Sequence, residues 1–131
     1  AKKNYIFSHH ASAPDVIAYA KKTGCACVIG TTGHTVEEKA LIYAAAEEIP
    51  VFFSGNMSLG IAVLCKLAKQ AAASFPDADV EIVEIHHNRK VDAPSGTALM
   101  IANAIKTVRT QAQLLLGRAG MAKRAPEEIG I

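Results

Sequence analysis

The chain has 131 residues, of which half are hydrophobic and a fifth are charged, and its formal net charge is +2. This composition supplies enough apolar surface for a core and excludes a disordered segment. Acidic and basic residues are mixed along the chain, and no long apolar run occurs, so we expect neither a nucleic-acid-binding surface nor a membrane span.

The cysteines and the first residues indicate a cytoplasmic protein. Cys25, Cys27 and Cys65 are odd in number and follow no disulfide framework, which favours reduced and buried thiols. The residues around Tyr5 and Phe7 do not form the apolar segment of a signal peptide.

Strand and helix patterns alternate in the first half of the chain. Short apolar runs predict strands, while Ser12 with Asp15 and Thr35 with Glu38 resemble capping boxes that open helices. The run before Gly30 is continuously apolar, which is typical of a strand buried on both faces. The expected order is strand 4–7, helix 12–23, strand 25–29, helix 35–48 and strand 51–53. Right-handed crossovers would make this a parallel sheet with helices on its faces.

Ligands of such sheets bind at the carboxyl ends of the strands. The loops expected there are 8–11, 30–34 and 54–57. Gly30 to Gly33 would let a ligand approach the backbone, and Asn56 offers a donor and an acceptor. Both loops can equally be ordinary strand-to-helix turns.

The second half has a different pattern, and we expect a domain boundary between residues 1–57 and 58–131. A long helix is predicted over 58–75, with Leu59, Val63, Leu67 and Ala71 forming its apolar stripe. A strand over 80–85, a helix from 95 to about 109, a turn at 117–120 and the start of a strand at 128–131 are expected to follow.

The segment after residue 85 carries the most informative chemistry. His86, His87, Arg89 and Lys90 lie within five residues, and a helix start follows at Ser95. Cations and the backbone N–H groups of a helix N-terminus bind anions, and an imidazole can transfer a proton near neutral pH. The alternative is a solvated loop with an N-cap serine, and the combination of residue types favours a functional site.

Adjacent histidines do not favour a metal site. His86 and His87 would point to opposite faces of a strand, and the same holds for His9 and His10. No cysteine or carboxylate stands at a supporting spacing, so we expect no metal.

The stretch Glu-Ile-His-His-Asn-Arg-Lys-Val-Asp-Ala-Pro-Ser-Gly-Thr-Ala, from Glu84 to Ala98, resembles the signature of the 4-hydroxy-tetrahydrodipicolinate (dihydrodipicolinate) reductase family. Further matches follow in the same order along nearly the whole chain. They are Val28 to Gly33, Asn56 to Ser58, Gly117-Arg118 and Glu128 to Ile131.

The resemblance implies an α/β fold, with an incomplete Rossmann-like parallel sheet in residues 1–57 and an α+β substrate and oligomerisation domain in residues 58–131. It also implies NADPH- or NADH-dependent reduction of a cyclic dicarboxylate to tetrahydrodipicolinate in the diaminopimelate and lysine pathway, by a cytoplasmic homotetramer. The implied catalytic residues are His86 and Lys90, with His87, Gly96 and Thr97 binding substrate. The implied cofactor contacts are Gly30, Thr31, Thr32, Ser54, Gly55, Asn56 and Met57.

Two family features are absent from these 131 residues. The Gly-x-x-Gly-x-Met-Gly turn that holds the cofactor pyrophosphate does not occur, and Ile6 to His10 replaces the usual Asp-Phe-Ser/Thr-x-Pro stretch. We therefore expect the central portion of a reductase. The alternative is a non-catalytic fragment that binds dicarboxylate anions weakly.

Overall fold

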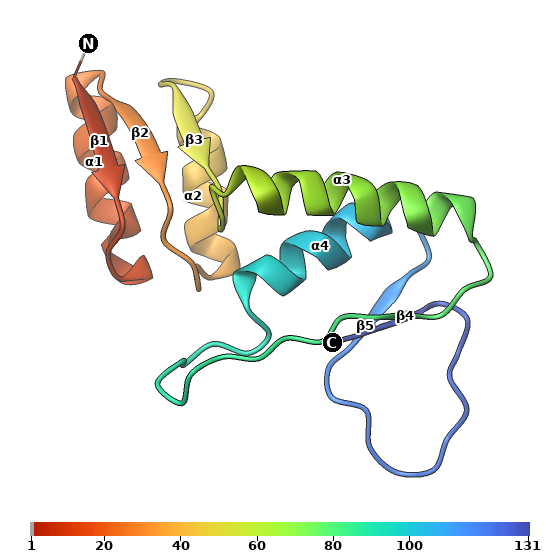
Figure 1. The fold of residues 1–131 in the computed structure, drawn as a ribbon. Coiled ribbons are helices and arrows are strands. Elements are labelled where there is room, and N and C mark those ends of the chain that lie inside the picture. The colour runs from red at the N-terminus through yellow and green to blue at the C-terminus, as the bar shows by residue number, and fades with distance from the viewer. Residues whose placement is uncertain (1) are drawn as a thin grey trace. The chain divides into compact units, whose positions relative to one another are not determined.

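A computed structural model describes residues 2–131, which divide into one unit ending at Met57 and a second unit from Ser58 to Ile131. Each unit has its own sheet and its own helices (Figure 1). No helix in this range is both long and apolar enough to cross a membrane.

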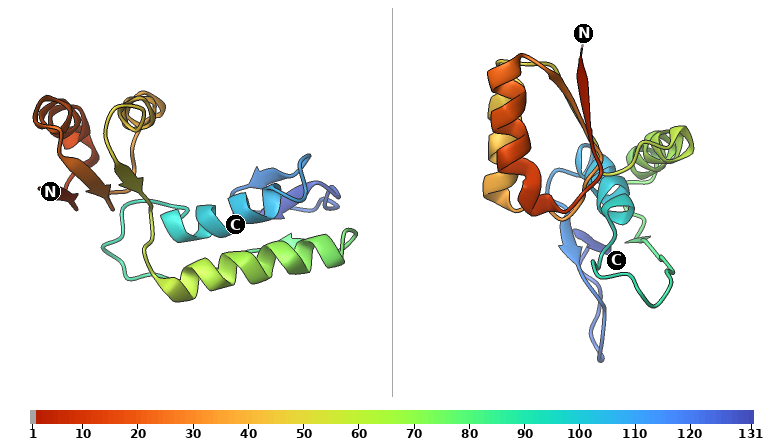
Figure 2. Two further views of the ribbon diagram at one scale, coloured as in Figure 1. Left: turned by 90° about the horizontal axis from the view of Figure 1, so that it is seen from above. Right: turned by 90° about the vertical axis from the view of Figure 1, so that its left-hand side faces the viewer.

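The first unit confirms the predicted alternation of strands and helices. Its three strands pair in parallel in the order β1-β2-β3, and α1 and α2 lie on the same face of the sheet (Figure 2). The elements are β1 (Lys3–Ile6), a short 3-10 turn η1 (His10–Ser12), α1 (Ala13–Thr23), β2 (Ala26–Ile29), α2 (Val36–Ala45) and β3 (Val51–Phe53).

The register of the strands separates a buried face from an open one. Ile6, Ile29 and Phe53 are register partners on the helix side, where Ile6 and Ile29 are buried in the core. One position earlier in each strand, the register partners are Tyr5, Val28 and Phe52, whose side chains lie on the opposite face. On that face Tyr5 is 66% exposed and Phe52 is 55% exposed. The expectation that residues 25–29 are buried on both faces is met on one face only: Cys27 and Ile29 are buried, whereas Ala26 and Val28 on the other face are half-buried, because both crossovers place their helices on one side.

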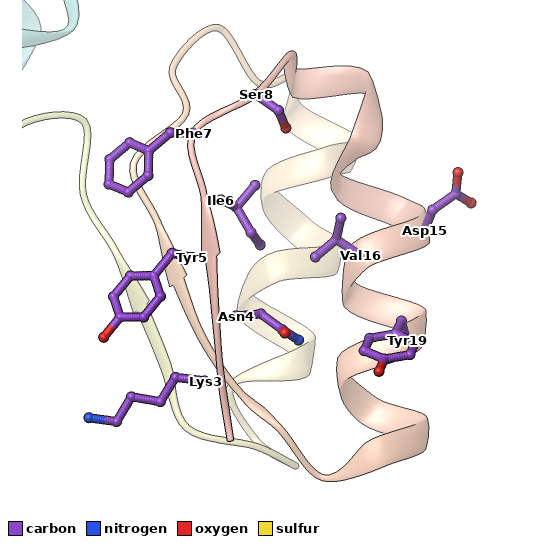
Figure 3. A pocket seen from close by; sticks show the side chains of 9 residues that line it. All are labelled: Lys3, Asn4, Tyr5, Ile6, Phe7, Ser8, Asp15, Val16 and Tyr19. Carbon is purple, nitrogen blue, oxygen red and sulfur yellow. The ribbon is translucent and has the colours of Figure 1, made fainter. Parts of the chain in front are cut away.

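A hollow of about 810 Å³ lies beside β1, the edge strand. Figure 3 shows Asn4 and Ile6 on the side of β1 that faces α1, and Tyr5 and Phe7 on the other side. Together with the exposed Tyr5, the hollow marks the β1 edge as an open part of this unit.

Local capping explains where the helices begin and end. Thr35 and Glu38 form the predicted capping box: the Thr35 N–H donates to Glu38 Oε2 at 2.8 Å, and the Glu38 N–H donates to Thr35 Oγ1 at 3.2 Å. Gly24 ends α1 with a φ of 64°, which glycine adopts without steric cost. The box predicted at Ser12 does not form, because η1 continues directly into α1 and the Ser12 hydroxyl donates to the His9 carbonyl instead.

The second unit contains α3, α4 and a second parallel sheet with the strand order β4-β6-β5. The two helices lie side by side (Figures 1 and 2). The elements are α3 (Leu59–Ser74), β4 (Val80–Glu81), α4 (Gly96–Lys106), β5 (Gln113–Leu115) and β6 (Glu128–Gly130). Strand β5 was not predicted, and β4 is shorter than the predicted strand 80–85 because its partner β6 offers only three residues.

The predicted apolar stripe of α3 is wrong. Leu59, Val63 and Leu67 are 80%, 49% and 56% exposed, whereas the buried core of this unit includes Ala72 and has Ala68 packed against it. Small side chains let helices approach closely, and α4 contributes a fully buried alanine to the same core. The large aliphatic side chains of α3 therefore point away from this core.

Candidate functional site

The predicted site residues of the second unit lie on an extended arm that leaves the sheet after β4 and returns to the start of α4 (Figure 1). The last sheet hydrogen bond runs from the Ile82 N–H to the Gly130 carbonyl at 2.9 Å. Beyond it, Val83 and Ile85 are 87% and 92% exposed. Because side chains of an extended chain alternate in direction, Glu84 between them points inward.

Glu84 joins the arm to the start of α4. Its Oε1 accepts the Ser95 backbone N–H at 2.7 Å, and its Oε2 accepts the Ser95 hydroxyl. These hydrogen bonds, with the nearby positive charges of His86 and Lys90, hold the pKa of the Glu84 carboxyl below its ordinary value. Glu84 is therefore an anion at neutral pH.

Lys90 has a carboxylate partner of its own. The Lys90 ammonium donates a short hydrogen bond to Asp92, and this contact lowers the pKa of the Asp92 carboxyl. The Lys90 side chain is only 19% exposed, so most of its aliphatic stem is buried. The turn that carries it is closed by the Lys90 N–H, which donates to the His87 carbonyl at 3.2 Å.

The two histidines have different surroundings. His86 Nδ1 lies 3.8 Å from Glu84 Oε2, which is an ion pair when the imidazole is protonated. His87 Nδ1 accepts the Arg89 backbone N–H at 3.2 Å, so a neutral His87 carries its proton on Nε2. His86 thus lies beside a carboxylate, whereas His87 contacts its own turn.

Gly96 and Thr97 occupy the first turn of α4, as predicted. Ser95 is the N-cap, and its hydroxyl oxygen accepts the Ala98 N–H at 3.1 Å. Helix N-termini stabilise anions through their N–H groups and the helix dipole. Glu84 contacts both Ser95 at this helix start and His86, so the structure brings His86 and the first turn of α4 together.

In the first unit, the predicted loops follow β2 and β3 at one edge of the sheet. The Ser54 N–H donates to the Ile29 carbonyl at 3.1 Å, and Ser54 Oγ donates to the Asn56 carbonyl at 2.6 Å. Thr31 is buried; its hydroxyl accepts the Ser8 N–H at 3.1 Å and donates to the Ile6 carbonyl at 3.4 Å. Thr31 thereby holds two strand ends together, and its hydroxyl is engaged in the fold.

The glycine at position 30 has a packing role as well. A Cβ added to Gly30 would lie 2.1 Å from Cε1 of Phe7, so the glycine makes room for this ring. Thr32, Gly55 and Met57 are exposed and remain accessible to a ligand.

A histidine cluster at the same edge was missed by sequence reasoning. His10 Nδ1 lies 2.9 Å from Glu38 Oε2, the ring of His9 is 4.3 Å from that of His10, and His34 contacts Phe53 edge-on at 5.3 Å. His34 is only 7% exposed, and burial lowers its pKa. Both of its ring nitrogens are buried with no hydrogen-bond partner among residues 2–131. The strand-end loops could have indicated this cluster, since parallel strands bring their carboxyl ends together.

The carboxylates of Glu84 and Asp92 were also given no role from the sequence, although they lie within the recognised stretch. Across residues 2–131, no group of three or more His, Cys, Asp or Glu side chains has the geometry of a metal site. The second unit thus combines an imidazole, a group that can transfer a proton, with a helix start, a place that can attract an anion.

Comparison with known proteins identifies the same protein family in both units. The protein-family model described as "Dihydrodipicolinate reductase, N-terminus" matches residues 6–57. The family model described as "Dihydrodipicolinate reductase, C-terminus" matches residues 60–131. The 4-hydroxy-tetrahydrodipicolinate reductase of Caldanaerobacter subterraneus subsp. tengcongensis is 49% identical over 127 residues, which cover 95% of this chain and 51% of the relative. That of Clostridium tetani is 43% identical over 127 residues, which cover 95% and 50%.

A solved structure has the same fold. It is the dipicolinate-bound dihydrodipicolinate reductase from Paenisporosarcina sp. TG-14, with a TM-score of 0.61 and 25% sequence identity. The match covers 97% of this chain and 52% of that structure. The chain therefore spans about half the length of the relatives that it matches.

Proposed function

The chain belongs to the dihydrodipicolinate reductase family, and we propose that its protein reduces 4-hydroxy-tetrahydrodipicolinate to tetrahydrodipicolinate with NADPH or NADH. The similarity to reductases of that name supports this activity, which belongs to diaminopimelate and lysine biosynthesis. In this proposal, residues 1–57 contribute to a dinucleotide-binding domain and residues 58–131 to the substrate-binding domain.

The observation that carries the proposal is the arrangement around the start of α4. His86 lies beside the Glu84 carboxylate, and Glu84 holds Ser95 at the helix start. A dicarboxylate suits this place, because N–H groups of the first turn bind one carboxylate and Lys90 supplies positive charge. The structural neighbour is described as dipicolinate-bound, and dipicolinate is itself a dicarboxylate.

We assign roles to the residues of the second unit by this chemistry. Loss of the 4-hydroxyl group as water gives a conjugated imine; addition of a hydride to it would leave negative charge on the substrate ring, and one added proton completes the reaction. His86 acts as the acid/base and Lys90 as its partner proton donor, since both can neutralise charge as it develops. His87 contacts the substrate, while Gly96 and Thr97 hold its carboxylate.

The loops of the first unit fit the nicotinamide half of the cofactor. They follow parallel strands at their carboxyl ends, and the orphaned ring nitrogens of His34 are buried polar atoms of the kind that a polar ligand or water satisfies. A bound reduced nicotinamide supplies a hydride. The residues that would hold it are Gly30, Thr31, Thr32, Ser54, Gly55, Asn56 and Met57. Gly30 and Thr31 would do so through their backbone, because Phe7 packs on Gly30 and the Thr31 hydroxyl is engaged in the fold.

The experiment is an assay of the purified full-length protein. Oxidation of NADPH or NADH should depend on added 4-hydroxy-tetrahydrodipicolinate and should stop when dipicolinate occupies the site. If neither NADPH nor NADH is oxidised, the proposal is contradicted. The alternative, a protein that binds dicarboxylate anions without catalysis, would then remain.

The remaining expectations concern the whole protein. The family resemblance favours a homotetramer in the cytoplasm. Light scattering of the full-length protein measures the assembly, and a monomer at micromolar concentration would contradict a tetramer.

A further inference from the structure

We propose that Glu84 is a positioning residue that acts through His86 and through Ser95, and this inference rests on the proposed function. Its carboxylate reaches both partners at once: Oε1 accepts the Ser95 N–H at 2.7 Å, and Oε2 lies 3.8 Å from His86 Nδ1 while accepting the Ser95 hydroxyl. One side chain therefore connects the acid/base residue with the carboxylate-binding helix start.

The position of Glu84 on the arm is the first argument. Along this extended segment the apolar Val83 and Ile85 are exposed, whereas the charged Glu84 points inward and is half-buried. Charged side chains normally occupy the solvent side, because burial of a charge costs free energy unless it is paired. The inverted pattern indicates that the contacts of Glu84 hold the arm in place.

The second argument is the orientation of the Ser95 hydroxyl. Its proton is donated to Glu84, and its oxygen accepts the Ala98 N–H at 3.1 Å, as an N-cap requires. Glu84 thus fixes the rotamer of the cap residue directly before Gly96 and Thr97. Movement of Glu84 would displace the N–H groups that we assign to the substrate carboxylate.

The third argument is electrostatic. The carboxylates that interact with His86 are Glu84 and Asp92, both from the arm itself. Asp92 is also paired with the Lys90 ammonium, whereas Glu84 lies 3.8 Å from His86 Nδ1 and makes its hydrogen bonds to Ser95. A protonated His86 forms an ion pair with Glu84, and this pair holds the imidazole beside the start of α4.

The test compares Glu84→Gln with Ser95→Ala in the full-length protein. Glu84→Gln keeps the length of the side chain and an acceptor for the Ser95 N–H but removes the charge. We expect its kcat to fall by about tenfold or more, because His86 loses the carboxylate that positions it, while its KM changes much less. Ser95→Ala keeps the charge and loses the hydroxyl, so its KM should rise several-fold with a much smaller change in kcat.

Glu84→Asp serves as the conservative variant, because it retains the charge on a shorter side chain. Its kcat should lie closer to that of the unmodified protein than the kcat of Glu84→Gln does, even if its KM rises. The inference is overturned if Glu84→Gln has the unmodified kcat, or if Ser95→Ala lowers kcat as far as Glu84→Gln does.

A measurement without catalysis separates this inference from the proposed function. In the free full-length protein with isotope-labelled histidine, at one fixed pH, the ring resonances of His86 should differ between Glu84→Gln and the unmodified protein, and those of His87 should coincide. Coincident His86 resonances overturn the inference even if the protein is an active reductase. Shifted His86 resonances support it even if reductase activity is absent.

Discussion

The Glu84 carboxylate accepts the backbone N–H of Ser95 at 2.7 Å, eleven residues further along the chain. This bond closes the arm that carries His86 and Lys90 onto the first residue before α4. The proposed acid/base group and the proposed carboxylate-binding turn are therefore held by one contact within the second unit.

Removal of the cap hydroxyl should destabilise this unit. In Ser95→Ala, α4 loses the acceptor for the Ala98 N–H and Glu84 loses a donor. We expect the free energy of unfolding to fall by about 1 kcal/mol, measured by urea denaturation. Thr107→Ala is the matched control at the other end of α4, where the hydroxyl donates to a carbonyl and is exposed, and it should cost much less.

His34 should make the stability of the first unit depend on pH. Burial lowers its pKa below the ordinary value of 6.5, so the unfolded chain binds a proton more readily than the folded one. The stability from this group is present above about pH 6.5 and is lost as the pH falls below that value.

The check is the free energy of unfolding measured from about pH 5 to about pH 8, an interval that includes the ordinary pKa of histidine. His34→Phe should flatten the curve, because Phe has no proton to gain and can keep the edge-on contact with Phe53. His9→Phe, a change at an exposed histidine, should leave the slope as it is. Equal slopes in all three proteins would refute the assignment to His34.

Arg109 should stabilise the end of α3 more than a surface ion pair does. Its guanidinium donates to the carbonyls of Ala72, Phe75 and Ala78 at 3.4, 2.5 and 2.8 Å. Arg109→Met should lower the free energy of unfolding by about 1–2 kcal/mol, since charged hydrogen bonds are lost while the aliphatic packing is kept. Arg124→Met, which removes surface ion pairs to Asp79 and Glu81, should cost less than about 1 kcal/mol in the same urea titration.

Thr97→Val tests whether the start of α4 binds its anion through the backbone. If N–H groups carry the binding, the apparent affinity for dipicolinate, measured by calorimetry, should change by no more than about threefold, since no hydrogen bond from the side chain is needed. Thr107→Val at the far end of α4 is the control. A loss beyond about tenfold in Thr97→Val alone would assign the binding to the hydroxyl.

Patterns with a local physical cause were predictable from the sequence. Thr35 and Glu38 form their capping box because both partners lie within one helical turn, and Gly24 ends α1 as a glycine at that place should. Ser12 has the same spacing to Asp15 but fails, because the 3-10 turn before α1 leaves its backbone helical.

Features that depend on distant partners were not predictable. Burial of α3 through Ala68 and Ala72 instead of Leu59 and Leu67 depends on how closely α4 packs, and β4 ends early because β6 is short. The motif stretch identified His86 and Lys90, but the contact of Glu84 with Ser95 depends on the arm folding back onto α4. The ion pair of Asp92 with Lys90 depends on the conformation of the arm itself.

The central claim is that His86 and Lys90 carry the proton chemistry of a nicotinamide-dependent reductase. The most direct measurement is the rate of NAD(P)H oxidation by the full-length protein at saturating substrate, in His86→Ala and Lys90→Ala, with Lys106→Ala in the last turn of α4 as the control. We predict that each of the first two variants is slower by about 10²-fold or more and that the control is unchanged. Rates near those of the unmodified protein in both His86→Ala and Lys90→Ala would contradict the claim.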